Sequence, residues 1–393
     1  MRIGVDATCW SNRRGYGRFT RALLNATLAL DRGNQYTFFT DLAEDEFPVP
    51  AGVEMVRVTG GVPTIKAAGA QGYRSLGDIW ALSRAISARP LDVFFFPSVY
   101  SYVPLLSRVP QLVTIHDVIP ERFPELVFPN LRSKLFWRAK VSMAVMQSKF
   151  VVTISEYSRQ CLQETLRIPA ARLRVVSEAS DPAFKKVEGS SAAALCAKWN
   201  VPAGAKFAVY VGGFSPHKNL PLLVEVFREV HAEFPDLYLV FAGDYSGDVF
   251  FSGYKQLTEQ VRAAGLEKRV IFTGYMGDDD LLTLLNHTTV LLLPSFCEGF
   301  GLPAVEAAAC GAPVIATTRS PLPALLGEGA IALDPEDRAG WREALRSILR
   351  DESKRAQMGR AALAAASALS WDNSARQLLK IFDEVATNRA AAA

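Results

Sequence analysis

The stretch VLLLPSFCEGFGLPAVEAAACGAPVIAT, Val290 to Thr317, places a glycine-rich turn and an apolar segment between two short apolar runs. The runs VLLLP and PVIAT are continuously apolar, which is typical of strands that are covered on both faces in a parallel sheet. The segment between them reads as a helix that begins at Leu302 or Pro303. Two carboxylates stand out in it, Glu298 in the turn and Glu306 inside the otherwise apolar helix.

The same alternation of short apolar runs and longer helical stretches continues along the chain in two series. The first series is RIGVD, YTFFT, VEMVRV, DVFFFP, QLVTIHD, FVVTIS and LRVVS, and the second is FAVYVGG, LYLVFAG, RVIFTG, VLLLP, PVIAT and AIAL. Each series is long enough for its own doubly wound parallel sheet. The 393 residues also exceed the usual size of one hydrophobic core. We therefore expect an α/β protein with two facing Rossmann-like domains and a cleft between them.

The domain boundary is expected where the strand pattern is interrupted. Residues 181–206 contain charged residues, Gly, Ser and Pro but no apolar run, which makes this stretch the best linker candidate. We place the boundary near residue 190, so a first domain covers 1–190 and a second domain covers 191–370. The tail has helical apolar spacing and predicts a helix over about 371–388 that packs back on the first domain.

Composition is that of an ordinary soluble globular protein, with 49% hydrophobic and 21% charged residues. Five scattered cysteines form no CxxC pair, and no early apolar run has the length of a signal peptide or membrane helix, so we expect a reduced, cytoplasmic protein. Residues 1–190 carry 24 Lys and Arg against 17 Asp and Glu, whereas the remainder carries 19 against 23. This asymmetry is too weak for nucleic-acid binding and favours a phosphate-bearing substrate or a membrane surface.

Doubly wound sheets bind ligands at the carboxyl ends of their strands, so loops that directly follow strands are the candidates for chemistry. Gly299 and Gly301 allow close backbone approach, and the following helix N-terminus offers free N–H groups. We expect Glu298 to accept hydrogen bonds from ligand hydroxyls. Glu306 is expected to bind the vicinal hydroxyls of a ribose, because one carboxylate accepts two donors. The alternative is that Glu298 caps the helix and Glu306 faces solvent.

The segment EGFGLPAVE, Glu298 to Glu306, resembles the E-x7-E signature of retaining glycosyltransferases of family 4, which have the GT-B fold. Other segments extend the resemblance over nearly the whole chain: GYGRFTRALL at 15–24, TIHD at 114–117, VVTISEYSRQ at 151–160 and YVGGFSPHKNLPLLVEVF at 210–227. The resemblance implies that Glu306 binds the nucleotide ribose. It also implies that the donor sugar is held by Glu298 and by the amides of the following residues, Gly299, Phe300, Gly301 and Leu302.

The loop VGGFSPHKN follows the first strand of the second domain. Lys218, at the entrance to the next helix, is placed to hold a diphosphate as a point charge, helped by the helix dipole; a solvated loop lysine is the alternative. The family often carries an arginine where this chain has Gly213, so one phosphate contact is missing or comes from elsewhere. His217 is a secondary candidate for the leaving phosphate, with a solvent-facing histidine as the equal alternative.

In the first domain, Gly15 and Gly17 bracket a tight strand-to-helix turn whose amides are expected to face a diphosphate or the acceptor. Nearby positive charge comes from Arg13, Arg14 and Arg18. The glycines could equally be needed for the turn alone. His116 ends the strand run QLVTI, and the resemblance implies that it contacts the donor sugar near the reacting carbon, although a lone histidine is usually structural.

The acidic run Asp278 to Asp280 mimics the DxD of metal-dependent glycosyltransferases, but it opens a helix, where the macrodipole favours acids. We therefore expect no metal and no cofactor. Tyr275 and Met276, at a strand end, are predicted to contact the nucleotide base. The basic stretch 130–149 also contains large apolar residues, and it predicts either contact with an anionic membrane or a helix that packs on its own sheet with a solvated basic rim.

These features predict a retaining, metal-independent hexosyltransferase. It would move a sugar from a GDP- or UDP-linked nucleotide-diphosphate sugar to a hydroxyl acceptor, a saccharide or lipid-linked saccharide, in polysaccharide or glycolipid assembly. The expected catalytic residues are His116, Lys218 and Glu298, and the enzyme is expected to be cytoplasmic, with peripheral membrane contact through 130–149 as an option. Two alternatives stay open: a glycosyl phosphorylase of the same architecture and a non-catalytic sugar-nucleotide binding protein.

Overall fold

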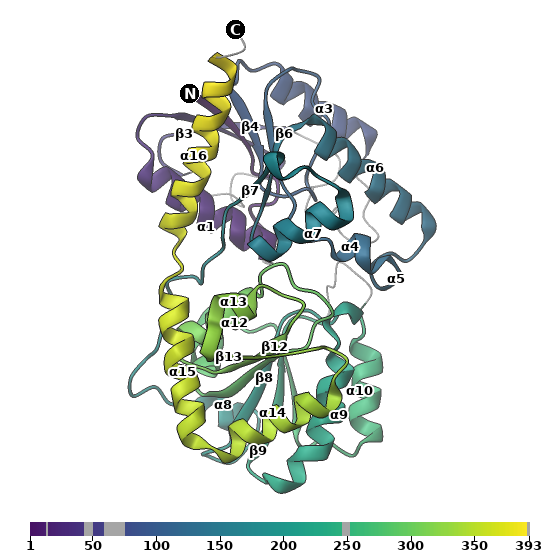
Figure 1. The fold of residues 1–393 in the computed structure, drawn as a ribbon, viewed down its shortest axis with the longest axis vertical. Helices are drawn as coiled ribbons and strands as arrows, with labels where there is room; N and C mark the ends of the chain where they lie inside the picture. The colour runs from purple at the N-terminus through teal and green to yellow at the C-terminus, as the bar shows by residue number, and fades with distance from the viewer. Residues whose placement is uncertain (13–14, 43–49, 59–74, 246–251, 391–393) are drawn as a thin grey trace. The chain divides into compact units, whose positions relative to one another are not determined.

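The computed structural model describes the chain except for residues 13–14, 43–49, 59–74, 246–251 and 391–393 (Figure 1). The chain divides into two units. Unit 1 comprises Met1–Pro124, Phe128–Glu178 and Ser370–Ala393, and unit 2 comprises Glu125–Val127 and Ala179–Leu369. The chain therefore leaves unit 1 after Glu178, ahead of the predicted boundary at 190, and returns to unit 1 at Ser370, where the C-terminal helix was expected to begin.

Unit 1 is built on a parallel sheet of seven strands in the order β3-β2-β1-β4-β5-β6-β7. The strands are β1 (Arg2–Asp6), β2 (Gln35–Thr40), β3 (Val53–Arg57), β4 (Val93–Phe96), β5 (Gln111–Thr114), β6 (Ser148–Thr153) and β7 (Leu173–Val175). Every apolar run of the first series is a strand. The run in β4 buries all four of its side chains, as expected for a strand that is covered on both faces. The strand order reverses between β1 and β4, which is where doubly wound sheets bind ligands.

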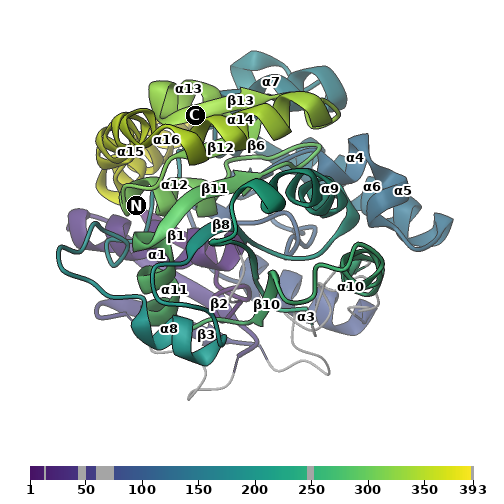
Figure 2. The same cartoon turned by 90° about the horizontal axis from the view of Figure 1, so that it is seen from below.

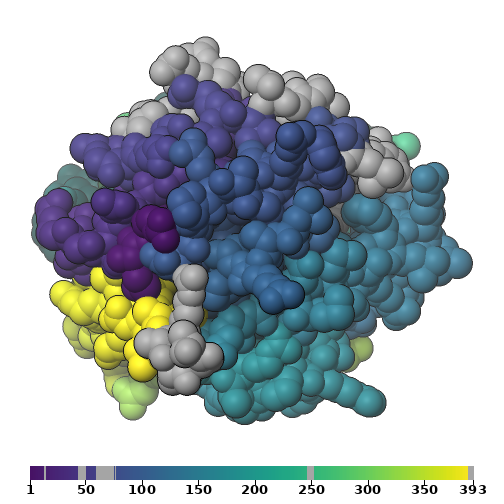
Figure 3. Space-filling view, turned by 90° about the horizontal axis from the view of Figure 1, so that it is seen from above, coloured from purple at the N-terminus to yellow at the C-terminus, as the bar shows by residue number. Residues whose placement is uncertain are grey.

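The helices of this part of the chain are α1 (Gly15–Leu30), α3 (Leu76–Ser87), α4 (Ile119–Arg122), α5 (Pro124–Val127), α6 (Leu131–Gln147), α7 (Glu156–Leu166), the 3-10 turn η1 (Ala170–Arg172) and α16 (Trp371–Ala390). The last helix of the chain packs along α1 and reaches β4. The rings of Phe382 and Phe95 meet with centroids 6.1 Å apart. Figure 3 shows α16, in yellow, against the amino-terminal segment of the chain, in purple. This packing explains why the last residues of the chain belong to unit 1.

Unit 2 is built on a parallel sheet of six strands in the order β10-β9-β8-β11-β12-β13. The strands are β8 (Lys206–Val211), β9 (Leu237–Ala242), β10 (Val270–Gly274), β11 (Thr288–Leu293), β12 (Val314–Thr317) and β13 (Ala330–Leu333). Every run of the second series is a strand. Leu291 of β11 pairs with Val209 of β8 on one side and Val314 of β12 on the other, so the strand order reverses between β8 and β11.

The helical segments of unit 2 are α8 (Ala193–Lys198), η2 (Pro216–Lys218), α9 (Leu220–Val230), η3 (His231–Glu233), α10 (Tyr254–Ala263), α11 (Asp278–Asn286), α12 (Leu302–Ala309), α13 (Leu322–Leu326), η4 (Gly327–Gly329), α14 (Arg338–Arg350) and α15 (Glu352–Ser367). Figure 2 shows α9 and α10 on one face of the sheet and α11 and α12 on the other. Helices on both faces account for the continuously apolar strands. The fold is therefore two Rossmann-like domains, as the sequence predicts.

Candidate functional site

Two loops that follow neighbouring strands of unit 2 bring Lys218 and Glu298 together. Lys218 ends η2 after β8, and Glu298 lies in the turn after β11. Lys218 Nζ donates a hydrogen bond to Glu298 Oε1 over 2.7 Å, and the two side chains are only 21% and 10% exposed. Because β8 and β11 flank the reversal of the strand order, this ion pair lies where an open parallel sheet binds its ligand.

The carboxylate of Glu298 has a second fixed partner. Ser295, which is completely buried, donates its hydroxyl to the same Oε1 over 2.6 Å. The backbone N–H of Glu298 donates to the carbonyl of Arg319 over 3.0 Å. Side chain and backbone are therefore both held by hydrogen bonds within unit 2. Sequence reasoning missed Ser295, although this residue directly follows a predicted strand and the strand-end rule would have selected it.

The loop that carries Lys218 is fastened to the loop after β11. Asn219 adopts a left-handed conformation with φ 53°. Its side-chain amide donates to the carbonyls of Pro294 and Pro335 over 3.2 and 2.8 Å. The N–H of Phe296 donates to the carbonyl of His217 over 2.9 Å. Lys218 is thus positioned by its neighbours on both sides as well as by its ion pair.

His217 is buried, so the solvent-facing interpretation of this residue is wrong. Burial, reinforced by the positive charge of Lys218, holds the pKa of His217 well below its usual value. The imidazole is therefore neutral at pH 7, and Lys218 is the cation of this loop.

The glycines in these loops allow close backbone approach. A Cβ on Gly243 would lie 1.9 Å from the carbonyl oxygen of Gly212, so the chain after β9 packs directly on the chain after β8. The hydroxyl of Tyr210 donates to the carbonyl of Gly213 over 2.7 Å, which fixes the residue where the family often has an arginine. In the other loop, Gly301 has φ +87°, and a Cβ there would meet Leu322 at 2.8 Å.

Glu306 lies inside α12 with its side chain completely buried, so the solvent-facing interpretation is wrong. Its charge contributes, after burial, to raising the pKa of Cys310, one turn further along the helix, to about 12. A carboxylate kept in an apolar helix is costly, and such positions are typical of binding and catalytic sites. Phe300 and Leu302 are also buried, so they can reach a ligand through their backbone amides rather than through their side chains.

Tyr275 and Met276 follow β10, the edge strand that lies two strands from β8. Strands are spaced by about 4.8 Å, so these residues begin roughly 10 Å across the sheet from the Lys218–Glu298 pair. Tyr275 is 59% exposed, whereas Met276 is buried. The structure therefore places these two residues at the same edge of the sheet as the ion pair but not beside it.

In unit 1, the ring of His116 is held on three sides. Nε2 lies 3.0 Å from the carbonyl oxygen of Pro97, which follows β4, and the edge of the ring meets Phe19 of α1 with centroids 4.9 Å apart. Nδ1 lies 3.8 Å from Oε1 of Glu178, which is also buried. Sequence reasoning missed Glu178. It follows the run LRVVS, so the strand-end rule would have selected it as well.

The glycine loop of unit 1 is described apart from Arg13 and Arg14, which lie outside the described residues. A Cβ on Gly17 would lie 2.1 Å from the carbonyl oxygen of Asn12, whereas a Cβ on Gly15 would meet nothing within 4 Å. Packing of the turn therefore requires a glycine at position 17. It does not explain Gly15, which is exposed at the start of α1.

The acidic run opens α11, with all three carboxylates in its first turn, as expected. Asp280 forms an ion pair with Lys198 at 3.1 Å. Among the described residues, no group of three or more His, Cys, Asp or Glu is arranged to hold a metal ion.

Residues 131–147 of the basic stretch 130–149 form α6, whose N-terminus is capped by Asn130. Val141 and Ala144 are buried, yet large apolar residues on other sides of the helix are exposed by 54–74%: Leu131, Leu135, Phe136 and Met146. Arg132 and Arg138 are exposed on the same helix, and Lys149 is exposed in β6, which follows it. The helix thus packs on its own sheet, as one interpretation expected, and it also presents an apolar outer face. No helix in the described part of the chain has the length and apolarity needed to cross a membrane.

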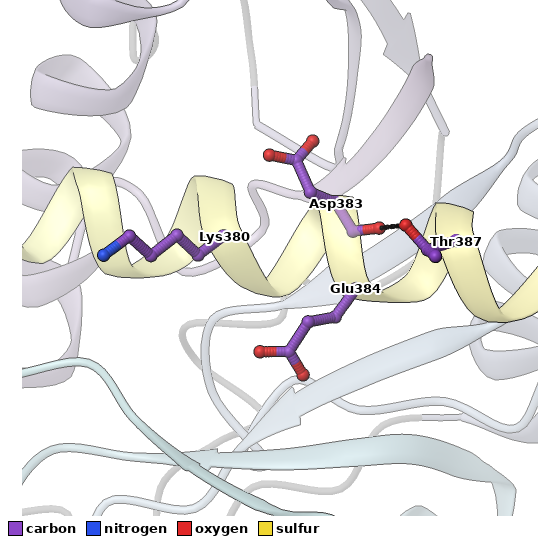
Figure 4. A pocket seen from close by; sticks show the side chains of 4 residues that line it. All are labelled: Lys380, Asp383, Glu384 and Thr387. Carbon is purple, nitrogen blue, oxygen red and sulfur yellow. Dashed lines mark hydrogen bonds between the residues drawn. The ribbon is translucent and has the colours of Figure 1, made fainter.

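A shallow pocket on α16 lies apart from the candidate site residues described above. It is lined by Lys380, Asp383, Glu384 and Thr387, whose side chains spread along the helix (Figure 4). The Thr387 hydroxyl donates to the Asp383 carbonyl, and Glu384 forms an ion pair with Arg174. The pocket holds none of the predicted site residues.

Comparisons with known families match the two halves of the chain separately. Residues 13–184 match the family profile described as Glycosyltransferase Family 4, and residues 193–364 match the profile described as Glycosyl transferases group 1. The O-antigen chain mannosyltransferase B of Escherichia coli is 27% identical over 274 residues, which cover 69% of each chain. For other curated relatives, the matched segment spans 31% to 52% of their own length.

Solved structures resemble the whole chain. Sucrose-phosphate synthase from Thermosynechococcus elongatus superposes with a TM-score of 0.76 at 18% identity, covering 99% of this chain and 100% of its own. Anabaena Alr3699/HepE, solved in complex with UDP and glucose, superposes with a TM-score of 0.74 at 20% identity, covering 98% of this chain and 100% of its own. At this identity the likeness establishes the two-domain fold alone.

Proposed function

We propose a reaction for this chain on the premise that it is a glycosyltransferase and belongs to family 4. The reaction is the transfer of a sugar from a GDP- or UDP-linked nucleotide-diphosphate sugar to a hydroxyl acceptor, with retention of the anomeric configuration and without a metal ion. The observation that carries the proposal is the Lys218–Glu298 pair, with the buried carboxylate of Glu306 in the helix that follows.

Each of these groups suits one part of such a donor. The Lys218 ammonium is a compact positive charge for the diphosphate. The Glu298 carboxylate, whose Oε1 already accepts from Lys218 and Ser295, offers its remaining acceptor sites to sugar hydroxyls. Glu306 can accept two hydrogen bonds from the vicinal hydroxyls of a ribose. Tyr275 and Met276, about two strand spacings away, are assigned to the base at the far end of the nucleotide.

In the proposed reaction, the bond between the anomeric carbon and the diphosphate oxygen breaks. The acceptor oxygen bonds to the same carbon on the same face, and its proton passes to the departing diphosphate. Negative charge develops on that diphosphate, where Lys218 and the amides at the N-terminus of α12 stabilise it. His116 is assigned to the donor sugar near the reacting carbon, on the resemblance of TIHD to the family's segment. A single preorganised donor of this kind contributes about 3–4 kcal/mol to lowering the barrier.

The comparisons support the class of substrate. A relative that matches over most of its length is named as an O-antigen chain mannosyltransferase, and a structural neighbour was solved with UDP and glucose. We therefore assign this chain a hexose donor and a saccharide or lipid-linked saccharide acceptor.

A ligand panel tests the donor assignment. GDP, UDP and ADP are each added to the protein, and the melting temperature is recorded. A diphosphate at one hundred times its dissociation constant should stabilise the protein by about 2.7 kcal/mol. Lys218→Met should lose this shift. Lys198→Met is the matched control, because Lys198 is also paired with a carboxylate in unit 2 but is 61% exposed. If no nucleoside diphosphate stabilises the protein, the proposal is wrong.

Turnover tests the reaction. The protein is incubated with the sugar-linked form of the best nucleotide and a set of hydroxyl acceptors, and product stereochemistry is read by NMR. Retention of the anomeric configuration with full activity in EDTA is expected. Sugar phosphate formed from a glycoside and inorganic phosphate, without nucleotide, would assign the chain to the phosphorylases. Nucleotide binding without transfer to any acceptor would instead support a non-catalytic sugar-nucleotide binding protein.

We also propose that the exposed apolar face of α6 rests on an anionic membrane surface and so presents the enzyme to a lipid-linked acceptor. The supporting observation is the combination of four large apolar side chains exposed by more than half with the exposed Arg132 and Arg138 on the same helix. Buried apolar surface and cationic charge together determine how strongly a helix binds at an interface. Basic residues near an anionic surface add about 1 kcal/mol each.

Vesicle co-sedimentation tests this surface. The protein should bind phosphatidylglycerol vesicles and bind phosphatidylcholine vesicles weakly. Leu135→Ser with Phe136→Ser should reduce binding at least tenfold. Trp80→Ser is the matched control, because Trp80 is an exposed aromatic residue of the same unit but lies on α3, and its loss should leave binding unchanged. Equal binding by all three proteins would remove α6 from the proposal.

A further inference from the structure

Glu178 faces the imidazole of His116 from the segment that follows β7. Its Oε1 lies 3.8 Å from Nδ1, and both residues are more than nine-tenths buried. The two residues come from loops after different strands, β5 and β7, which are separated by β6 in the sheet. Nothing in the role assigned to His116 so far uses this carboxylate.

The other nitrogen of the ring determines what Glu178 can do. A carbonyl oxygen only accepts hydrogen bonds, so Nε2 of His116, 3.0 Å from the carbonyl of Pro97, carries a proton. In the neutral tautomer this leaves a lone pair on Nδ1, which points toward the carboxylate. The carboxylate of Glu178 is the polar group that faces this nitrogen, so it is placed to influence the orientation and the tautomer of the ring.

This arrangement fixes the ring from both nitrogens. Pro97 holds the Nε2 side, Glu178 faces the Nδ1 side, and Phe19 packs against the ring with centroids 4.9 Å apart. A flip of the ring would exchange the nitrogens with ring carbons, and both polar contacts would be lost. Second groups that orient a functional histidine in this way commonly have large effects on activity.

We propose that Glu178 is the positioning residue of His116, holding the imidazole in one orientation and tautomer for contact with the donor sugar. The inference rests on the proposed function only through the role of His116. The position of the ring and its proton are properties of the protein without substrate, so they can be tested separately from transfer.

The first test is NMR of the imidazole nitrogens in the ligand-free protein. The chain has four histidines, and His116→Gln assigns the signals of His116 by their loss. A protonated Nε2 is expected in the wild type. Glu178→Ala should alter the tautomer or broaden the His116 signals, whereas Glu178→Gln should preserve the orientation because its amide can donate to Nδ1. Glu164→Gln is the control, since Glu164 is exposed and pairs with Arg122.

The second test is the split between turnover and binding. Glu178→Ala should lower kcat by about tenfold to a hundredfold, as loss of an outer-shell partner does elsewhere. The affinity for free nucleoside diphosphate should stay within about twofold, because that ligand lacks the sugar. Glu178→Gln should recover most of the lost kcat.

The outcomes separate the two ideas. If neither variant changes the His116 signals or kcat, the positioning role is refuted while the transferase stands. If Gln and Ala variants are equally impaired, the charge of Glu178 rather than its position is what matters, and the inference is also refuted. If the His116 signals respond as expected but the wild type transfers no sugar, the proposed function fails and the positioning of the ring remains.

Discussion

Replacing Glu298 by alanine should tighten the binding of free nucleoside diphosphate while it suppresses sugar transfer. In the structure, Lys218 donates to Glu298 over 2.7 Å. A diphosphate that recruits Lys218 must compete with this ion pair, which offsets part of the binding free energy. Removal of Glu298 removes the competitor and leaves a positive charge that the diphosphate can neutralise.

The size of the effect follows from the burial of the pair. Exposed ion pairs are worth about 0.2–1 kcal/mol, and hydrogen bonds to charged groups are worth about 1.5–3 kcal/mol. With side chains 21% and 10% exposed, the Lys218–Glu298 pair lies between these cases. We therefore expect about 1–2 kcal/mol, or roughly a 5- to 30-fold gain in diphosphate affinity. The ligand-free variant should be destabilised by a similar amount, because Lys218 has lost its partner.

Two measurements test this prediction together. Calorimetry gives the affinity for the free diphosphate, and initial rates with the sugar-linked donor give kcat. Glu298→Ala should bind the diphosphate more tightly, show a larger thermal shift with it than the wild type, and lose about a hundredfold or more in kcat. Ser295→Ala is the matched control: it removes the other hydrogen bond to Oε1, at 2.6 Å, and keeps the Lys218 pair. Its diphosphate affinity should be unchanged.

The opposite result would refute the assignment of roles. If Glu298→Ala weakens diphosphate binding more than about tenfold, an effect of roughly 1.4 kcal/mol, the carboxylate contacts the nucleotide itself. If Glu306→Ala at the same time leaves that binding intact, the two glutamates have exchanged roles. If both variants bind and turn over like the wild type, the site lies elsewhere in the chain.

Three further predictions concern other parts of the molecule. Gly17→Ala should destabilise the protein by about 1–3 kcal/mol in urea unfolding, because its Cβ would lie 2.1 Å from the Asn12 carbonyl, whereas Gly15→Ala should be tolerated. Asp279→Asn with Asp280→Asn should retain activity, and EDTA should not abolish it; loss that Mn²⁺ or Mg²⁺ restores would show that a metal is needed. Burial raises the pKa of Glu121 from 4.5 to about 7. Because the pKa is raised in the folded protein, the contribution of Glu121 to stability is complete below pH 4.5 and is lost as the pH rises through 7. Glu121→Gln should therefore be more stable than the wild type by about 1–2 kcal/mol at pH 8, a figure discounted for solvent screening. At pH 4 the variant should be no more stable than the wild type. Thermal melts at the two pH values check this, and equal melting at pH 8 would contradict it.

The strands were predictable because their signal is local. A continuously apolar run such as VFFF in β4 is buried on both faces, and its neighbours in the sheet do not alter that reading. The αβ alternation then leaves few topologies, and the doubly wound order is one of them. The boundary between the two units was harder to predict from the sequence. The linker was placed from the composition of 181–206, whereas the chain changes units at Glu178, where no such change of composition marks it.

Which side of α6 is buried could not be predicted from the spacing of its apolar residues. A helix with apolar residues on several sides gives no single hydrophobic stripe, and the pattern alone does not say which side is buried. Packing against the sheet buries Val141 and Ala144 and leaves Leu131, Leu135 and Met146 exposed. Only the neighbours of the helix in three dimensions separate the two sets.

The candidate site illustrates a different limit. Sequence reasoning selected Lys218, Glu298 and His116 from loops after strands, and it assigned each side chain to a part of the ligand. A buried polar or charged side chain, however, is costly unless it has a partner within the protein. In the structure, Lys218 is paired with Glu298, and His116 faces Glu178. These pairs join loops that are 80 and 62 positions apart in the chain, and they form only because strands distant in sequence end at the same edge of a sheet. The strand-end rule therefore finds the site residues, and the requirement that each buried polar side chain have a partner within the protein finds the residues opposite them. Applied together, the two rules would have placed Glu178 among a few candidates from the sequence, with Asp41 and Glu156, because each is a carboxylate that follows a predicted strand in the same sheet as His116.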